Sequence, residues 1–131
     1  MQNKALEKLK KTNSSIIQEN ESECYFVNHK CEADPNHPIY TYQELHKHHI
    51  FGRANRKISD KYGLWVKVCC MRCHVTGPTS IHENPNDGKD LFLKQTAQRE
   101  VEKQLRTGYE PEEAEAGARK DFISIFGKSY L

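Results

Sequence analysis

The chain has 131 residues, a formal net charge of +2 and only 36% hydrophobic residues. This size fits one domain, and the low apolar content predicts a small core that a bound metal would help to stabilise. No run of about 18 apolar residues exists and the N-terminus lacks an apolar stretch, which excludes a predicted membrane span or signal peptide. We therefore expect a cytoplasmic protein without a membrane partner, whose five cysteines bind metal rather than form disulfides.

The mild net charge hides a basic central segment. Residues 1–39 carry five Lys and Arg against six Asp and Glu, residues 40–74 carry seven against two, and residues 75–131 carry eight against ten. The central segment also contains four of the seven histidines and three of the five cysteines. Basic residues beside metal-binding side chains predict an anionic partner held next to a metal, although a solvated basic surface would carry the same charge.

The first half of the chain predicts an arm, a loop and a hairpin. Residues 1–22 are polar with only Leu6 and Leu9 in helical spacing, so we expect a frayed helix or a disordered arm. Prolines within residues 35–38 exclude a helix there and favour a loop between two extended segments. Residues 45–51 and 64–68 are predicted strands, the second alternating and β-branched, and together they would make a hairpin with residues 52–56 as a loop.

Two helices are predicted in the last third of the chain. Residues 84–88 are typical of a turn, and Asp87 can cap a helix over residues 90–106 that ends near Gly108. Pro111 and the acids after it begin a second helix, which Gly127 ends. The residues expected to face the core are Leu93, Ala97, Val101 and Leu105 on the first helix, and Ala118, Phe122, Ile125 and Phe126 on the second.

Three short motifs contain side chains that bind metals or transfer protons. They are Cys24-x6-Cys31, His46-Lys47-His48-His49 and Cys69-Cys70-Met71-Arg72-Cys73-His74, with His82 eight residues beyond the last. Each motif alone is weak evidence, but the ordered set around a predicted hairpin is a strong signal. Two spaced pairs of thiols can close a tetrahedral zinc site, which leaves the histidines for a second, open metal position.

These residues resemble the HNH, or ββα-metal, nucleases, and more narrowly the small HNH proteins encoded by phages and prophages. The resemblance covers roughly residues 23–131 and is carried by residues 44–52, 55–64, 70–74 and 81–82, and by the C-terminal residues 126–131 after the helix at 91–98. It implies an α+β fold, with a polar arm at 1–22, a ββα-metal core with a zinc knuckle at 23–88, and a helical extension at 89–131 packed on that core.

The resemblance also implies a divalent-metal-dependent endonuclease that hydrolyses DNA phosphodiester bonds. His49 would be the general base that takes a proton from the attacking water. His48, together with His74 and His82 from the helix of the ββα unit, would bind the catalytic ion (Mn, Mg, Ni, Co or Zn). Because neutral imidazoles prefer transition metals, this ligand set favours them over Mg²⁺. The family's asparagine, which orients the base, has no clear equivalent, and Asn55 and Asn84 are the candidates.

A structural zinc is expected at Cys24, Cys31, Cys70 and Cys73. The first pair is separated by six residues rather than the two more usual in the family, so His29 could replace Cys31, and Cys69 remains an alternative to Cys70. Single- or double-stranded DNA would be held through its phosphates by basic residues of the hairpin loop, which confers affinity without sequence preference. Those residues are Arg53, Arg56, Lys57 and Lys61, and His46 is expected to be a strand residue or a DNA contact.

The phage-like resemblance implies a role in DNA recombination or replication. Phage or host recombination proteins would then be partners, and the host cytoplasm the location. The alternative function is a zinc-stapled nucleic-acid-binding module without catalytic activity. The missing asparagine favours this alternative, and the intact His48-His49 pair disfavours it.

Overall fold

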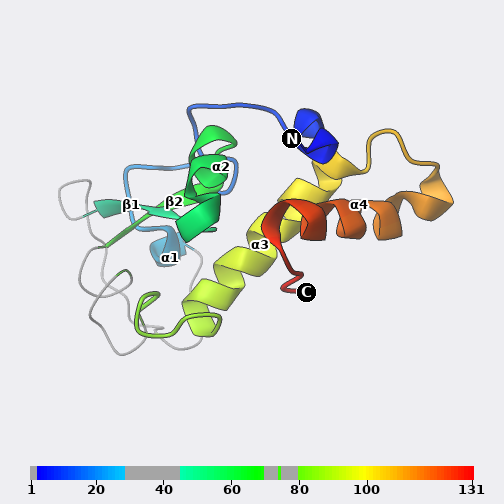
Figure 1. The fold of residues 1–131 in the computed structure, drawn as a ribbon. Helices are drawn as coiled ribbons and strands as arrows, with labels where there is room; N and C mark the ends of the chain where they lie inside the picture. The colour runs from blue at the N-terminus through cyan, green and yellow to red at the C-terminus, as the bar shows by residue number, and fades with distance from the viewer. Residues whose placement is uncertain (1–2, 29–44, 70–73, 75–79) are drawn as a thin grey trace.

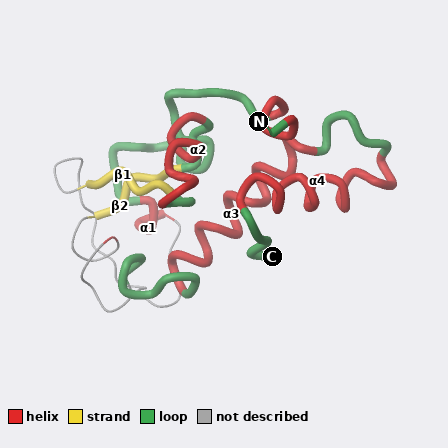
Figure 2. The backbone as a smooth tube through the Cα atoms, in the orientation of Figure 1, coloured by secondary structure: helices red, strands yellow, loops and turns green. Residues whose placement is uncertain are grey.

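The computed structural model describes residues 3–28, 45–69, 74 and 80–131. These residues confirm the α+β class: a two-stranded antiparallel sheet lies at one end, and two long helices extend away from it (Figure 1). Figure 2 shows both strands close to the short helices α1 (Tyr25–Asn28) and α2 (Arg56–Lys61). The predicted loop over residues 35–38 lies outside the described residues.

The sheet consists of β1 (Leu45–His49) and β2 (Trp65–Cys69), which pair antiparallel as the sequence predicts. In this register His48 lies opposite Val66 and His49 opposite Trp65. Side chains alternate between the two faces of a strand, so the two neighbouring histidines leave β1 on opposite sides. The register of the sheet therefore directs the side chains of His48 and His49 to different surroundings.

The connection between the strands is more ordered than the predicted loop. A 3-10 turn, η3 (Arg53–Asn55), leads into α2, and the hydroxyl of buried Ser59 donates to the Phe51 carbonyl at 2.7 Å and accepts from the Phe51 amide at 3.1 Å. Gly63 then turns the chain into β2 with a φ of +74°, where a Cβ would collide with the Ser14 carbonyl oxygen. These contacts fix α2 beside the end of β1.

A frayed helix or a disordered arm is expected over residues 1–22, and the described residues 3–22 form one short helix and pack against the rest of the chain. A 3-10 helix, η1 (Lys4–Lys8), packs near the long helices, where Lys8 donates to the Leu105 carbonyl at 3.1 Å. Further along, the Thr12 and Ile16 amides donate to the carbonyls of Lys61 and Gly63. Polar composition did not predict this order because backbone hydrogen bonds contribute much of it.

The two long helices agree closely with the predicted ones. Helix α3 (Gly88–Leu105) is capped by Asp87, whose carboxylate accepts from the Gly88 amide at 2.9 Å, and α4 (Pro111–Phe126) ends at Gly127 with a φ of +95°. The predicted core-facing residues are all buried except Ile125, which is partly buried. None of the described helices is long and apolar enough to cross a bilayer.

The end of α4 packs against Phe51, which lies just after β1. The Phe51 ring lies 4.4 Å from the Phe126 ring and 5.7 Å from the Phe122 ring, measured between centroids, and 5.8 Å from the Tyr130 ring. These aromatic contacts hold α4 against the end of β1, the strand that contains His48 and His49. It also brings Tyr130 to the groove described below.

Candidate active site

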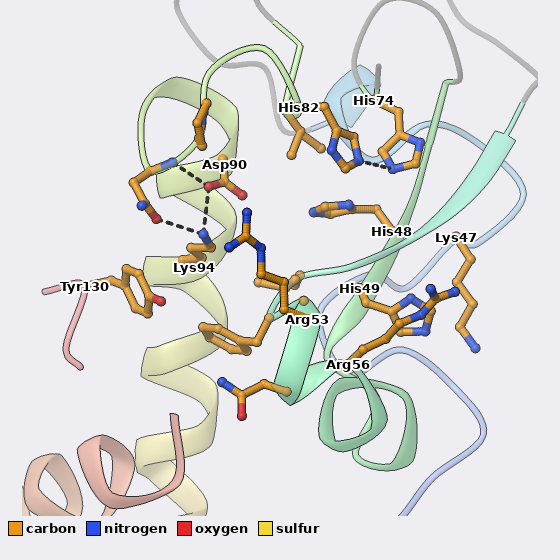
Figure 3. A pocket seen from close by; sticks show the side chains of 17 residues that line it. Lys47, His48, His49, Arg53, Arg56, His74, His82, Asp90, Lys94 and Tyr130 are labelled. Atoms are coloured by element: carbon orange, nitrogen blue, oxygen red, sulfur yellow. Dashed lines mark hydrogen bonds and ion pairs between the residues drawn. The ribbon is translucent and has the colours of Figure 1, made fainter. Parts of the chain in front are cut away.

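Three imidazoles from separate parts of the chain converge beside the sheet. His48 comes from β1, His74 follows β2, and His82 precedes α3 (Figure 3). One ring nitrogen from each lies within 4.8 Å of those of the other two, and the His74 and His82 Nε2 atoms are 3.0 Å apart. The three residues that the family resemblance implies as ligands of one ion are therefore neighbours in space.

His82 does not lie on a helix, and in this respect the expectation from the family resemblance was wrong. It lies in a turn before α3, where its amide donates to the His74 carbonyl at 3.0 Å. Buried Ile81 anchors this turn in the core, and the Asn84 amide closes it on the Ile81 carbonyl. The turn residues that follow delay the start of α3 until Gly88.

The electrostatics of this cluster keep its inner histidines neutral. Burial, and secondarily the neighbouring His74 and His82, lowers the pKa of His48 from 6.5 to about 3. Burial, followed by His82 and His46, lowers the pKa of His74 to about 4. Both rings therefore carry a nitrogen lone pair at neutral pH, as metal ligation requires.

The buried Nε2 atom of His48 has no hydrogen-bond partner among the described residues. An unpaired buried polar atom costs free energy, and such groups in folded proteins generally have a partner. A metal ion bound by three neutral imidazoles would provide that partner. The residues present thus fit a divalent transition metal.

His49 points away from this cluster and contacts a carboxylate instead (Figure 3). Its Nε2 atom lies 3.2 Å from Asp60 Oδ1, an oxygen that also accepts from Lys47 Nζ at 2.7 Å. Hydrogen bonds from Lys47, and then from His49, lower the pKa of Asp60. Because the ionised carboxylate only accepts, His49 Nε2 must donate, which leaves the lone pair of neutral His49 on Nδ1.

Asp60 is a site residue that the sequence reasoning missed. The two asparagines considered for this position bond elsewhere: Asn55 donates to the Phe126 carbonyl and Asn84 to the Ser80 carbonyl, and neither bonds to His49. The available signal was that Asp60 is one of only two acids in the basic segment of residues 40–74.

A groove of about 760 Å³ runs past all four of these histidines. Of the four residues expected to contact DNA, Arg53 and Arg56 line this groove, whereas Lys57 and Lys61 are exposed on α2 and do not line it. Lys94, which no sequence motif singles out, lines it too, and its ammonium group lies 2.9 Å from the carboxylate of buried Asp90. The groove is thus predominantly basic, as an anionic ligand requires.

Arg53 has an unusual backbone at the edge of this groove. Its φ is +52°, a conformation that costs a residue with a side chain about 1 kcal/mol or more. Strained residues of this kind concentrate at functional sites, because the surrounding structure must hold them in place. Arg53 is therefore a strained residue that also lines the groove.

The predicted zinc ligands are only partly within the described residues. Cys24 is described and buried, whereas Cys31, Cys70 and Cys73 lie outside the described residues, as does His29. The Cys69 amide donates to the Cys24 sulfur at 3.3 Å, and the Cys69 side chain is buried. The zinc site stays a prediction, with Cys69 now known to lie beside Cys24.

Comparison with protein-family models, curated proteins and solved structures found no match to this chain. The function is therefore inferred from the residues themselves and from their arrangement. That arrangement consists of a cluster of three histidines, a fourth histidine bonded to a carboxylate, and a basic groove that all four line.

Proposed function

We propose that the protein is a divalent-metal-dependent endonuclease that hydrolyses DNA phosphodiester bonds, with His49 as the general base. The observation that carries the proposal is the convergence of His48, His74 and His82 in the same basic groove as His49. Phosphodiester hydrolysis needs a proton acceptor and positive charge near the phosphate, and this groove offers both.

His48, His74 and His82 would hold the metal ion. Imidazole ligands suit Mn²⁺, Co²⁺, Ni²⁺ or Zn²⁺ better than Mg²⁺, which prefers oxygen. A divalent ion bound there would supply positive charge to the scissile phosphate and the leaving 3′-oxygen.

The remaining roles belong to the side chains around the ion site. His49 takes the proton of the attacking water at Nδ1, since Asp60 occupies Nε2. The guanidinium groups of Arg53 and Arg56 and the ammonium of Lys94 bind the DNA phosphates along the groove. These backbone contacts give affinity for nucleic acid and no preference for sequence.

Asp60 has a testable role in this reaction. Replacing it with alanine should lower kcat by about tenfold, part of the 10²–10⁴ that general-base catalysis contributes. KM should stay the same or fall, because the change removes a negative charge near the groove. Asp60→Asn retains an oxygen that accepts from His49 Nε2 and should keep most of the activity. Steady-state cleavage of a fluorescent oligonucleotide duplex measures both parameters.

Glu100→Ala is the matched control for Asp60→Ala. Glu100 is also a solvent-accessible carboxylate paired with a lysine, Lys103 at 2.9 Å, but its described contact is on α3, whereas Asp60 also contacts His49. Its replacement should leave kcat and KM unchanged. If Asp60→Ala also retained wild-type kcat, Asp60 would not be positioning the base.

The decisive experiment is plasmid nicking by the purified chain across divalent metals. We expect no cleavage in chelator and restored nicking on adding Mn²⁺, Co²⁺, Ni²⁺ or Zn²⁺, with Mg²⁺ less effective. If no ion supports cleavage of single- or double-stranded DNA while the chain still binds DNA, the proposal fails in favour of a nucleic-acid-binding module. A metal count of one firmly held zinc and no weaker second site would favour the same alternative.

A further inference from the structure

His46 lies beside His74, one of the three clustered histidines. The two Nδ1 atoms are 3.3 Å apart, and the rings meet edge to face with centroids 5.4 Å apart. His46 is on β1 two residues before His48, so both side chains leave the strand on the same side. The sequence favours a strand residue or a DNA contact over a metal ligand for this position, and His46 does not line the groove.

The second ring nitrogen of His74 is also engaged. Its Nε2 atom faces the Nε2 atom of His82 at 3.0 Å, while its Nδ1 atom faces His46. Nε2 is therefore the atom that faces the cluster, and it must carry the lone pair to bind a metal. A neutral imidazole has one N–H, so the proton of a ligating His74 lies on Nδ1 and points at His46.

We propose that His46 is a positioning residue for the metal site, which accepts the Nδ1–H of His74 on its own Nδ1 and so fixes the tautomer and orientation of that ligand. This inference rests on the proposed function, because it assigns a role toward the same ion. Metal-bound histidines commonly donate their other N–H to such a partner, and its loss typically weakens metal affinity by about 10- to 100-fold.

The geometry argues against His46 as a fourth ligand. The group of nitrogens within 4.8 Å of one another comprises only His48, His74 and His82 among the described residues. His46 instead approaches the His74 nitrogen that is not directed at His82. Asparagine can imitate this contact, because its Oδ1 follows Cγ as the histidine Nδ1 does and accepts a hydrogen bond.

The test is a Mn²⁺ titration of the full chain, with free Mn²⁺ followed by electron paramagnetic resonance. Mn²⁺ is chosen because thiolate sites bind it poorly, so the cysteines do not obscure the histidine site. His46→Ala should weaken Mn²⁺ binding about 10- to 100-fold, whereas His46→Asn should bind nearly as tightly as the wild type. Lys47→Ala, the next residue on the same strand, should leave Mn²⁺ binding unchanged because Lys47 contacts Asp60.

Electron spin echo measurements on bound Mn²⁺ count the coordinated imidazoles and separate the outcomes. Three imidazoles in the wild type and three in His46→Ala support the positioning role. A loss of one imidazole in His46→Ala, or equal affinity of His46→Ala and the wild type, overturns it. If the wild type binds no Mn²⁺ through imidazole, the proposed metal site itself fails and the role of His46 fails with it.

Discussion

Replacing His49 with alanine is expected to lower DNA cleavage by about 10²- to 10⁴-fold, the usual contribution of a general base. The side chain is 15% exposed and its described hydrogen bond is to Asp60, so the variant's fold is checked beside its activity. His49 leaves β1 on the side opposite the histidine cluster, so metal binding should persist. The measurement is the single-turnover cleavage rate at saturating metal, beside circular dichroism and the Mn²⁺ affinity.

Chemical rescue distinguishes a lost base from a damaged site. His49→Gly leaves space in the groove for free imidazole, which should restore part of the cleavage rate in proportion to its concentration. The same addition to His82→Ala serves as the control for imidazole acting as a metal ligand. A His49→Ala protein that cleaves DNA nearly as fast as the wild type would exclude His49 as the base.

The elements predicted best are those whose signal is local. The stripe of Leu93, Ala97, Val101 and Leu105 repeats at helical spacing and is buried as expected, and Asp87 caps that helix. Hydrophobic periodicity works here because α3 needs one continuous apolar face to pack against α4. The strand pair could also be predicted, because apolar and polar residues alternate in the β2 segment and two of its residues are β-branched.

The elements missed depend on contacts between distant residues. The N-terminal arm has too few apolar residues to predict order, yet its Ser15 hydroxyl donates to the Trp65 carbonyl and its Gln18 side chain accepts from the Lys67 amide. Helix α2 was expected as a loop at its start. Its placement is what brings Asp60 to His49 across eleven residues of sequence.

In the candidate site, too, some residues could be predicted from the sequence, whereas the roles of others depend on contacts between distant parts of the chain. The family resemblance implied one ion site at His48, His74 and His82, and these three residues do lie together in space. The roles of Asp60 and His46 follow from which ring nitrogen each one faces, and that depends on the strand register and the placement of α2. Spacing in the sequence carries no information about ring orientation.

Replacing His48 with leucine is expected to stabilise the metal-free protein while abolishing its activity. His48 is 8% exposed and its Nε2 atom is unpaired among the described residues, so the folded state carries the cost of an unsatisfied polar group. Leucine removes that cost, and the free energy of unfolding in chelator should rise by about 1–2 kcal/mol. Mn²⁺ affinity and DNA cleavage should fall to background, because one of three ligands is lost.

The stability difference should also depend on pH. The pKa of His48 is about 3 in the folded chain, against an ordinary value of 6.5. Between these values the unfolded chain binds a proton that the folded chain does not. Wild-type stability is therefore fully present above about pH 6.5 and is lost as the pH falls, by at most about 1.4 kcal/mol per unit for this residue. His48→Leu lacks this loss, so its advantage over the wild type should widen from pH 7 to pH 4.

Urea unfolding in chelator at several pH values measures this effect, and His82→Ala is the matched control. His82 belongs to the same cluster but is exposed, so its replacement should remove metal affinity without the gain in stability. If His48→Leu destabilised the metal-free protein at every pH, the His48 imidazole would stabilise the metal-free fold through packing, and its unpaired Nε2 atom would not be a net cost. The expected result makes His48 a residue retained for metal binding at the expense of the apo fold, as functional sites often require.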